Sequence, residues 1–248
     1  MKKQPITAEQ FSEFAASRRS TRSFQSTPVD PALVQQLITD GLTAPSWSNT
    51  RPYLVAVADG EVRERISAEF LKRWEALSAA RVGGLVPKLR LALTRYGLPT
   101  SNLAITKPYE PDLLPRSQKV GRDLYGLLGI ARGDKKAREA SWAENYKFFN
   151  APVELFIFTH KSLGKFAAND AGLFAQNLML SAHSRGLGTC AQGAVAIWED
   201  VVRKEFDVPA RYSLLCGIAL GYPDEAIVNS FQAERLPASE ITVKPKKA

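Results

Sequence analysis

The segment from about Ala168 to Ser184 constrains the fold of this chain more than any other. Its residues suit a helix, but apolar side chains occupy nearly all of its faces. They include Leu173, Phe174, Leu178, Met179 and Leu180. Such a helix cannot face water on most sides, so it must be buried in a core or against a partner chain. Gly186 follows at the position where a helix commonly ends.

Three apolar runs predict buried strands, at residues 53–58, 153–159 and 213–220. Further helices are predicted at residues 8–17, 31–41, 61–77, 135–149 and 198–206. Thr7 with Gln10 forms a capping box for the first of these, and Asp30 before Pro31 starts the second. Strands separated by helices favour a layered α/β or α+β fold with one central sheet. Residues 83–115 are rich in glycine and proline, and no element is assigned there.

The composition fits one globular domain over residues 1–248. Hydrophobic residues make up 45% of the chain, which is enough for a sizeable core. Lys2 and Lys3 have no apolar stretch behind them, so we expect no secretory signal. No apolar run reaches the ~20 residues that a membrane helix needs. We therefore expect a cytoplasmic protein that makes no membrane contact.

Two other classes of protein are disfavoured. Cys190, Cys216, His160 and His183 show no metal-type spacing, so we expect no metal site and two packed, reduced thiols. The net charge of +8 invites a nucleic-acid interpretation. However, the basic residues are spread along the chain, and the obvious basic run is the tail VKPKKA. We expect no nucleic-acid partner.

Four short segments carry the candidate chemistry, and two lie near the N-terminus. RRSTRSF, residues 18–24, has three arginines and two serines within seven positions. These side chains suit a phosphate, because guanidinium groups donate in pairs and hydroxyls reach the remaining oxygens. APSWSNTRPY, residues 44–53, is a loop stiffened by prolines, and its Ser46 and Asn49 suit the polar edge of a planar ring.

The other two segments lie near the C-terminus. GLGTCAQGAVA, residues 186–196, has three glycines that let backbone N–H groups approach a ligand, but it lacks the dinucleotide-binding spacing. LGYPDEAIVNSFQAERLP, residues 220–237, carries Arg235 with no evident charge partner. Each segment taken alone also suits a structural role: a basic helix end, a surface loop, a helix cap followed by a turn, and a surface arginine.

In this order and at these distances, the four segments resemble the FMN-dependent nitroreductase family, especially its nitrobenzoate-reductase-like members. The resemblance covers roughly residues 18–58 and 151–235 and is weaker over residues 61–150. It implies an α+β fold whose central, mostly antiparallel sheet is flanked by helices. It also implies an intertwined homodimer that holds FMN without a covalent bond at the subunit interface.

The resemblance assigns a role to each matching position. Arg18, Arg19, Ser20 and Arg22 stand where the family grips FMN, and Arg18, Ser20 and Arg235 would hold its phosphate and ribityl chain. Arg22 would face the N1 and C2=O edge of the ring, and Gln192 and Gly193 would approach N5. Pro45, Ser46 and Asn49 match the loop that the second subunit places over the ring.

Three positions depart from the family pattern. Arg51 stands where glutamine is frequent, Gln192 where glutamate is frequent, and Trp47 is bulkier than the usual serine. The flavin would carry the chemistry at N5 while Arg22 and Gln192 tune it, so no catalytic acid–base pair is expected.

The implied activity is reduction of a nitroaromatic, quinone or flavin-type acceptor by NADPH or NADH, in a ping-pong sequence. Reductive dehalogenation, flavin reduction and a non-catalytic flavin-binding role stay open as alternatives on the same fold. Residues 61–150 carry many aromatic side chains, among them Tyr125 and Phe148. We expect this segment to form a lid over the ring or a dimer arm.

Overall fold

The computed structural model describes residues 6–101 and 103–246. At its centre is a four-stranded sheet with the strand order β1-β2-β4-β3, in which every neighbouring pair is antiparallel. The strands are β1 (Tyr53–Asp59), β2 (Val153–His160), β3 (Gly188–Gln192) and β4 (Tyr212–Gly221). The predicted antiparallel sheet is confirmed, as are three of its strands. The short strand β3 falls in the glycine-rich segment for which a close backbone approach to a ligand, or a helix cap followed by a turn, was expected, and no strand was predicted there.

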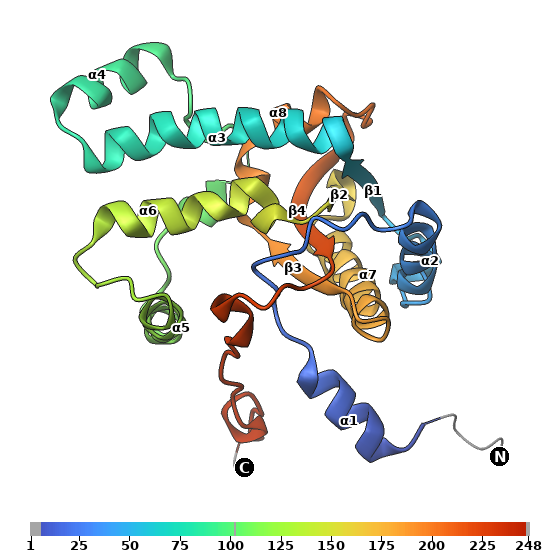
Figure 1. Ribbon diagram of the computed structural model, residues 1–248. Helices are drawn as coiled ribbons and strands as arrows, with labels where there is room; N and C mark the ends of the chain where they lie inside the picture. Colours follow the sequence, from blue (N-terminus) through green and yellow to red (C-terminus); the bar gives the residue numbers. More distant parts are fainter. Residues whose placement is uncertain (1–5, 102, 247–248) are drawn as a thin grey trace.

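Helices pack on both faces of this sheet (Figure 1). The helices of the described residues are α1 (Ala8–Ser17), α2 (Pro31–Gly41), α3 (Gly60–Val82), α4 (Leu85–Thr94), α5 (Leu114–Leu127), α6 (Lys135–Ala143), α7 (Lys165–His183) and α8 (Glu199–Arg203). Helices α2 and α7 lie on one face of the sheet and α3 on the other. The predicted caps are present: Thr7 and Gln10 form the capping box, and Asp30 accepts from Ala32 N–H at 2.8 Å. Gly186, at φ +74°, ends the last turn after α7.

Strand β2 separates two hydrophobic cores. Leu155 and Ile157 pack in the core beneath α2 and α7, whereas Phe156 and Phe158 pack in the core on the side of α3. All four side chains are fully buried. A central strand buried on both faces has a continuous apolar run, which is why VELFIFT was recognisable as a strand.

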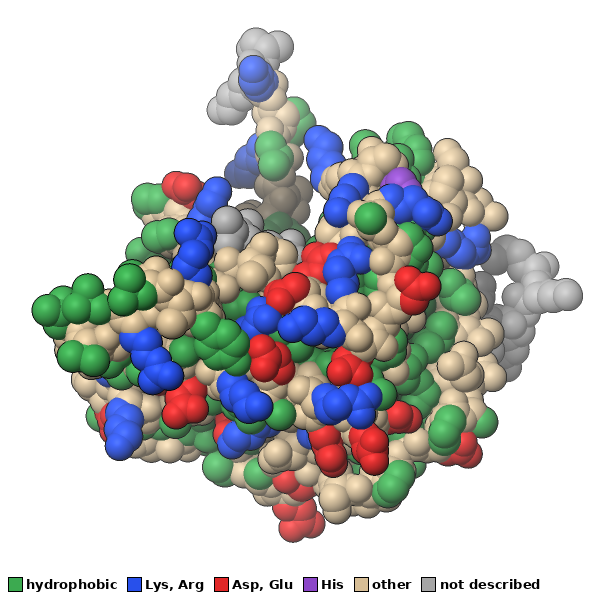
Figure 2. Space-filling view, turned by 90° about the horizontal axis from the view of Figure 1, so that it is seen from above, with side chains coloured by type: hydrophobic (Ala, Val, Ile, Leu, Met, Phe, Trp, Pro, Cys, Tyr) green, Lys and Arg blue, Asp and Glu red, His purple; other side chains and the backbone are tan. Residues whose placement is uncertain are grey.

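Between β1 and β2 the chain makes a long helical excursion away from the sheet (Figure 1). The predicted helix at 61–77 continues to Val82, and α4 and α5 occupy sequence to which no helix was assigned. The predicted helix at 135–149 is shorter in the structure. Helix α6 ends at Ala143, and a 3-10 segment, Glu144–Asn150, follows it. The exposed apolar residues Leu85, Val86 and Leu93 belong to α4, on the side of the molecule where Figure 2 shows a hydrophobic cluster at the left edge.

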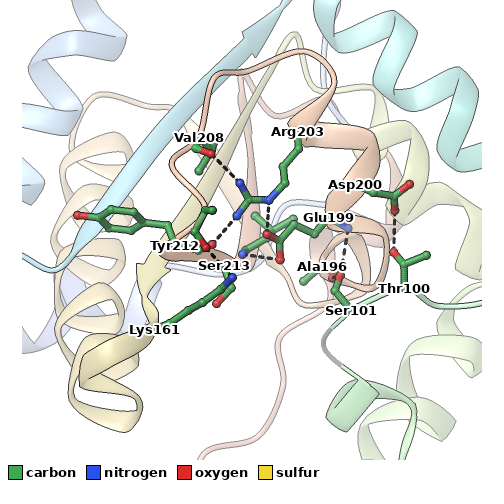
Figure 3. A network of polar contacts seen from close by, with 12 residues as sticks. Thr100, Ser101, Lys161, Ala196, Glu199, Asp200, Arg203, Val208, Tyr212 and Ser213 are labelled. Atoms are coloured by element: carbon green, nitrogen blue, oxygen red, sulfur yellow. Dashed lines mark hydrogen bonds and ion pairs between the residues drawn. The ribbon is translucent and has the colours of Figure 1, made fainter.

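A polar network ties the segment after β3 to β4 (Figure 3). Glu199 accepts from Leu214 N–H at 3.0 Å and pairs with Arg203, which donates to the carbonyls of Val208 and Tyr212. Ser101 donates to the Ala196 carbonyl at 2.9 Å. The helix predicted at 198–206 is therefore short, α8, and follows the 3-10 segment Ala194–Trp198. This network holds the chain in place just beyond Gln192.

Helix α7 is buried on one side only. Phe174 and Leu178 are fully buried against the sheet, but Phe166 is 42% exposed and Leu173 39% exposed. One chain therefore leaves an apolar face of this helix uncovered, and of the two expected arrangements, burial in a core or against a partner chain, the second stays a prediction for that face. Among the described residues, no helix is long and apolar enough to cross a membrane.

Glu154 on β2 is a fully buried carboxyl whose two oxygens have no hydrogen-bond partner. Gly217 leaves the space that this carboxyl fills, because a Cβ there would overlap it. Burial raises the pKa of Glu154 well above its usual value, and the charge of Arg63 offsets this in part. The pKa of Glu154 is therefore higher in the folded chain than in the unfolded chain. At a pH between these two values the unfolded chain has released a proton that the folded chain retains, so the free energy of unfolding falls as pH rises.

We predict that Glu154→Gln removes this pH dependence, since the amide stays neutral at every pH. The wild type should lose stability relative to the variant by about 1.4 kcal/mol per pH unit above pH 4.5, up to the folded pKa. Urea unfolding of both proteins between pH 5 and pH 8 measures this difference. Parallel stability curves would show that Glu154 is ionised in the folded state.

Candidate functional site

The N-terminal basic segment, residues 18–24, lies along the free edge of β3. Ser20 pairs with Thr189 in a parallel bridge, and Thr21 N–H donates to the Thr189 carbonyl at 2.9 Å. Gly188 makes this approach possible, because a Cβ there would lie 2.9 Å from Pro223 Cγ and closer still to Thr21. The structure thus brings together two segments that are about 170 residues apart in the sequence.

The C-terminal segment after β4 holds the basic segment from the other side. Arg22 N–H donates to Asn229 Oδ1 at 2.8 Å, and an Arg19 Nη donates to the Asn229 carbonyl at 3.1 Å. The side-chain amide of Asn229 donates in turn to the Ser23 carbonyl at 2.8 Å. Asn229 is therefore the residue that positions the basic segment. Asn229 was not predicted from the sequence, because one asparagine in a polar stretch carries no pattern.

Beside this junction is a cavity of about 320 Å³, here called the edge cavity. Its lining includes Arg18, Arg19, Thr21, His183, Gly188 and Thr189. Arg18 is half-buried, and its Nε has no hydrogen-bond partner. Burial, together with the like charge of Arg235, lowers the pKa of Arg18. Two guanidinium groups held near each other, one with an unsatisfied buried donor, are suited to an anion.

A second cavity of about 420 Å³, the central cavity, lies at the other end of β3. Arg22, Cys190, Gln192 and Gly193 are among its lining residues. Gln192 is only 2% exposed and donates from Nε2 to the Asn145 carbonyl at 2.8 Å, while its Oε1 is buried without a partner. The Gln192 side chain is thus fixed in place and keeps one unused acceptor.

The long excursion supplies the far wall of the central cavity. Tyr109, Leu124, Tyr125, Trp142 and Asn145 line it opposite β3. Of the aromatic residues named as lid candidates, Tyr125 is at the cavity, but Phe148 is fully buried in the core and is not a lid residue. Asn145 was missed because its contact with Gln192 spans 47 positions and uses a backbone carbonyl.

The loop with Pro45, Ser46 and Asn49 lies elsewhere, against α7, and lines neither of these two cavities. Trp47 N–H donates to Asp170 at 2.8 Å, and Ser46 Oγ accepts from Arg51 N–H at 3.1 Å. Ser48, Asn49 and Arg51 all have positive φ angles, between 44° and 57°. Non-glycine residues keep such angles only where their surroundings hold them. Arg51 also donates to the Asn49 side chain.

The chain's own residues fit FMN in two respects. The edge cavity offers guanidinium groups and an unsatisfied donor for a phosphate, and the central cavity offers polar groups beside aromatic walls for a flat ring. The thiol of Cys190 does not suggest separate chemistry, since burial raises its pKa to about 11. No cluster of three or more His, Cys, Asp or Glu that could hold a metal is present among the described residues.

Known proteins resemble the chain over nearly its whole length. The 4-nitrobenzoate reductase of Pseudomonas putida is 32% identical over 238 residues, which cover 96% of both chains. The nitrobenzene nitroreductase of Ectopseudomonas oleovorans is 29% identical and covers 91% of this chain and 92% of its own. The crystal structure of the FMN-dependent nitroreductase NfnB from Mycobacterium smegmatis, in complex with NADPH, matches with a TM-score of 0.78 and 27% identity, over 96% of this chain and 99% of that one.

Residues 15–222 also match the Nitroreductase family as a whole. This range includes all four strands, the basic segment, the Pro45–Asn49 loop and both residues Gln192 and Gly193. Arg235 lies beyond it. The chain belongs to the Nitroreductase family.

Proposed function

We propose that this protein is an FMN-dependent oxidoreductase that uses NADPH or NADH to reduce nitroaromatic acceptors. The observation that carries the proposal is the pair of cavities at the two ends of β3, each with an unsatisfied buried polar atom: Arg18 Nε and Gln192 Oε1. The relatives named above are nitroaromatic reductases, and one of them binds NADPH and depends on FMN, which supports the same assignment.

Each residue of the site has a proposed task. Arg18 and Arg235 would neutralise the phosphate, with Arg19 and Ser20 beside them. Gln192 and Gly193 would meet the ring near N5, and Pro45, Ser46 and Asn49 of a second subunit would cover its other face. Bound FMN would supply the chemistry, accepting hydride from a nicotinamide and passing it to the acceptor.

The protein's own contribution is charge, orientation and exclusion of water. Arg22 lines the central cavity, where its guanidinium would favour negative charge on the reduced ring. Tyr125 and Trp142 offer surfaces on which a flat reactant can stack. If a second subunit covers one face of the ring, the nicotinamide and the acceptor would use the remaining face in turn, which is a ping-pong sequence. Flat quinones suit the same walls.

We further propose that the protein is an intertwined homodimer. The exposed apolar face of α7 includes Phe166 and Leu173, and Trp47, 55% exposed, stacks on Phe166. Helix α1 has no buried residue and extends from the body of the molecule (Figure 1). Beyond residue 231 the described chain is almost entirely exposed as well. Two such chains can cover these surfaces by exchanging their ends.

The purified protein should be yellow and should release FMN, not FAD, on denaturation. Its visible absorption should bleach with NADPH under anaerobic conditions and return when 4-nitrobenzoate is added, because the two reactants use the cofactor in turn. Absorption spectroscopy and steady-state NADPH oxidation measure both results. A colourless protein that binds no FMN in a titration would overturn the proposal.

Replacement of Arg22 by Ala should make the bound flavin harder to reduce. Loss of one charge-assisted interaction costs about 1.5–3 kcal/mol, or about 30–60 mV for a two-electron couple. The midpoint potential should fall by this amount while FMN stays bound through Arg18. Arg185→Ala serves as the control, because it removes a cation paired with Asp40, outside both cavities. An equal potential in wild type and Arg22→Ala would refute the role of Arg22.

Substitution of Leu173 by Glu should convert the dimer to a monomer and release FMN, because it places a charge on the exposed face of α7. Light scattering coupled to gel filtration reports the mass, and the ratio of visible to ultraviolet absorbance reports the FMN content. Leu89→Glu on α4 is the matched control, since Leu89 is also exposed but lies far along the helical excursion. A wild-type monomer with active flavin would contradict the dimer.

A further inference from the structure

The helical excursion contains a third cavity, of about 500 Å³, here called the basic cavity. It lies between α5, α6 and the turn that joins them. Ten residues line it, among them Arg122, Arg132 and Arg138, and none of the ten carries a carboxylate. Neither the flavin assignment nor the nitroaromatic assignment uses any of these arginines.

The three arginines lack an acidic partner among the described residues, whereas other basic side chains nearby have one. Nearby basic side chains have acidic partners: Arg116 pairs with Glu240, Lys119 with Asp123 and Glu234, and Arg81 with Glu139. In contrast, Arg122, Arg132 and Arg138 form no ion pair with any described carboxylate. Arg138 instead stacks over the Tyr125 ring at 4.9 Å and donates to the Arg132 carbonyl at 3.4 Å. Three such charges around one hollow favour a ligand with concentrated negative charge.

The basic cavity adjoins the central cavity through helix α5. Tyr125 lines both cavities. Leu124 and Leu128 face the central cavity, whereas Gly121, Arg122 and Gly126 face the basic cavity. Gly121 and Gly126 border open space, since a Cβ added at either would meet nothing within 4 Å. One elongated ligand can therefore place one end beside Gln192 and the other among the arginines.

We propose that the basic cavity binds the 2′-phosphate of NADPH and makes this protein prefer NADPH to NADH. The inference rests on the proposed function, since it assumes that the nicotinamide enters the central cavity. A phosphomonoester carries up to two negative charges and three acceptor oxygens, which match three guanidinium groups. NADH has only a hydroxyl at this position and cannot use them.

The test combines binding and kinetics on the FMN-loaded protein. Titration calorimetry compares 2′,5′-ADP with 5′-AMP, which differ by the 2′-phosphate alone. Steady-state assays compare kcat/KM for NADPH and for NADH with 4-nitrobenzoate as acceptor. The variants are Arg122→Ala, Arg132→Ala and the two combined. Arg116→Ala is the matched control, because it lies on the same helix but is paired with Glu240 and does not line the cavity.

The wild type should bind 2′,5′-ADP at least tenfold more tightly than 5′-AMP. Each single variant should weaken 2′,5′-ADP binding and lower kcat/KM for NADPH by about tenfold or more, since each loses a charge-assisted contact. The values for 5′-AMP and NADH should change less than twofold, and Arg116→Ala should match wild type throughout. A wild type that does not distinguish 2′,5′-ADP from 5′-AMP, or variants that weaken NADPH and NADH equally, would overturn the inference.

These outcomes are separable from failure of the proposed function. A protein that binds no FMN or oxidises no NADPH fails the proposed function, whereas the calorimetric comparison needs no turnover. If 2′,5′-ADP bound only through Arg18 and Arg235 at the edge cavity, Arg18→Ala would abolish its binding and Arg122→Ala would not. That result would also overturn the inference.

Discussion

The site depends on the pairing of the basic segment with the free edge of β3. An edge strand presents unpaired backbone groups, and here the Ser20–Thr189 bridge and the Thr21 hydrogen bond use them. This pairing places the residues on either side of Ser20 at opposite ends of the strand, so that Arg18 lines the edge cavity and Arg22 the central cavity. The cavity proposed for the phosphate and the cavity proposed for the ring are thereby held at a fixed separation. Gly188 is required because the two segments would otherwise collide.

The sequence predicted those parts of the fold that depend on local signals. Strand β2 is buried on both faces, and α2 begins with a capping aspartate before proline, so both were recognisable. Strand β3 was missed because Gly188, Thr189 and Cys190 are small and form only one short edge of the sheet. Helices α4 and α5 were missed because Pro87 and Pro115 suggested loops, although proline is tolerated within the first turn of a helix.

The candidate site was predictable only where one segment carries several functional groups. Arg18, Arg19 and Arg22 and the Gln192–Gly193 pair line cavities at the two ends of β3, while their contacts with FMN stay a prediction. Asn229 and Asn145 act through single hydrogen bonds to distant backbone, which no local pattern shows. Phe148 and Tyr125 are both aromatic residues of the helical excursion, yet Phe148 is buried in the hydrophobic core and Tyr125 lines the central cavity. Only tertiary packing distinguishes them.

One chain supplies the two cavities but leaves the proposed ring-covering loop facing outward. Burial disfavours the charged form of Arg18 and lowers its pKa, and the like charge of Arg235 adds to this effect. A bound phosphate would offset both costs in the folded state and would thereby stabilise the fold. In the proposed homodimer, Ser46 and Asn49 of the second subunit would cover the other face of the ring, and the exposed Phe166 and Leu173 of α7 would lie in the interface. Cofactor binding and dimer formation should therefore strengthen each other, because the contacts between the ring and Ser46 and Asn49 of the second subunit form only when both FMN and the second subunit are present.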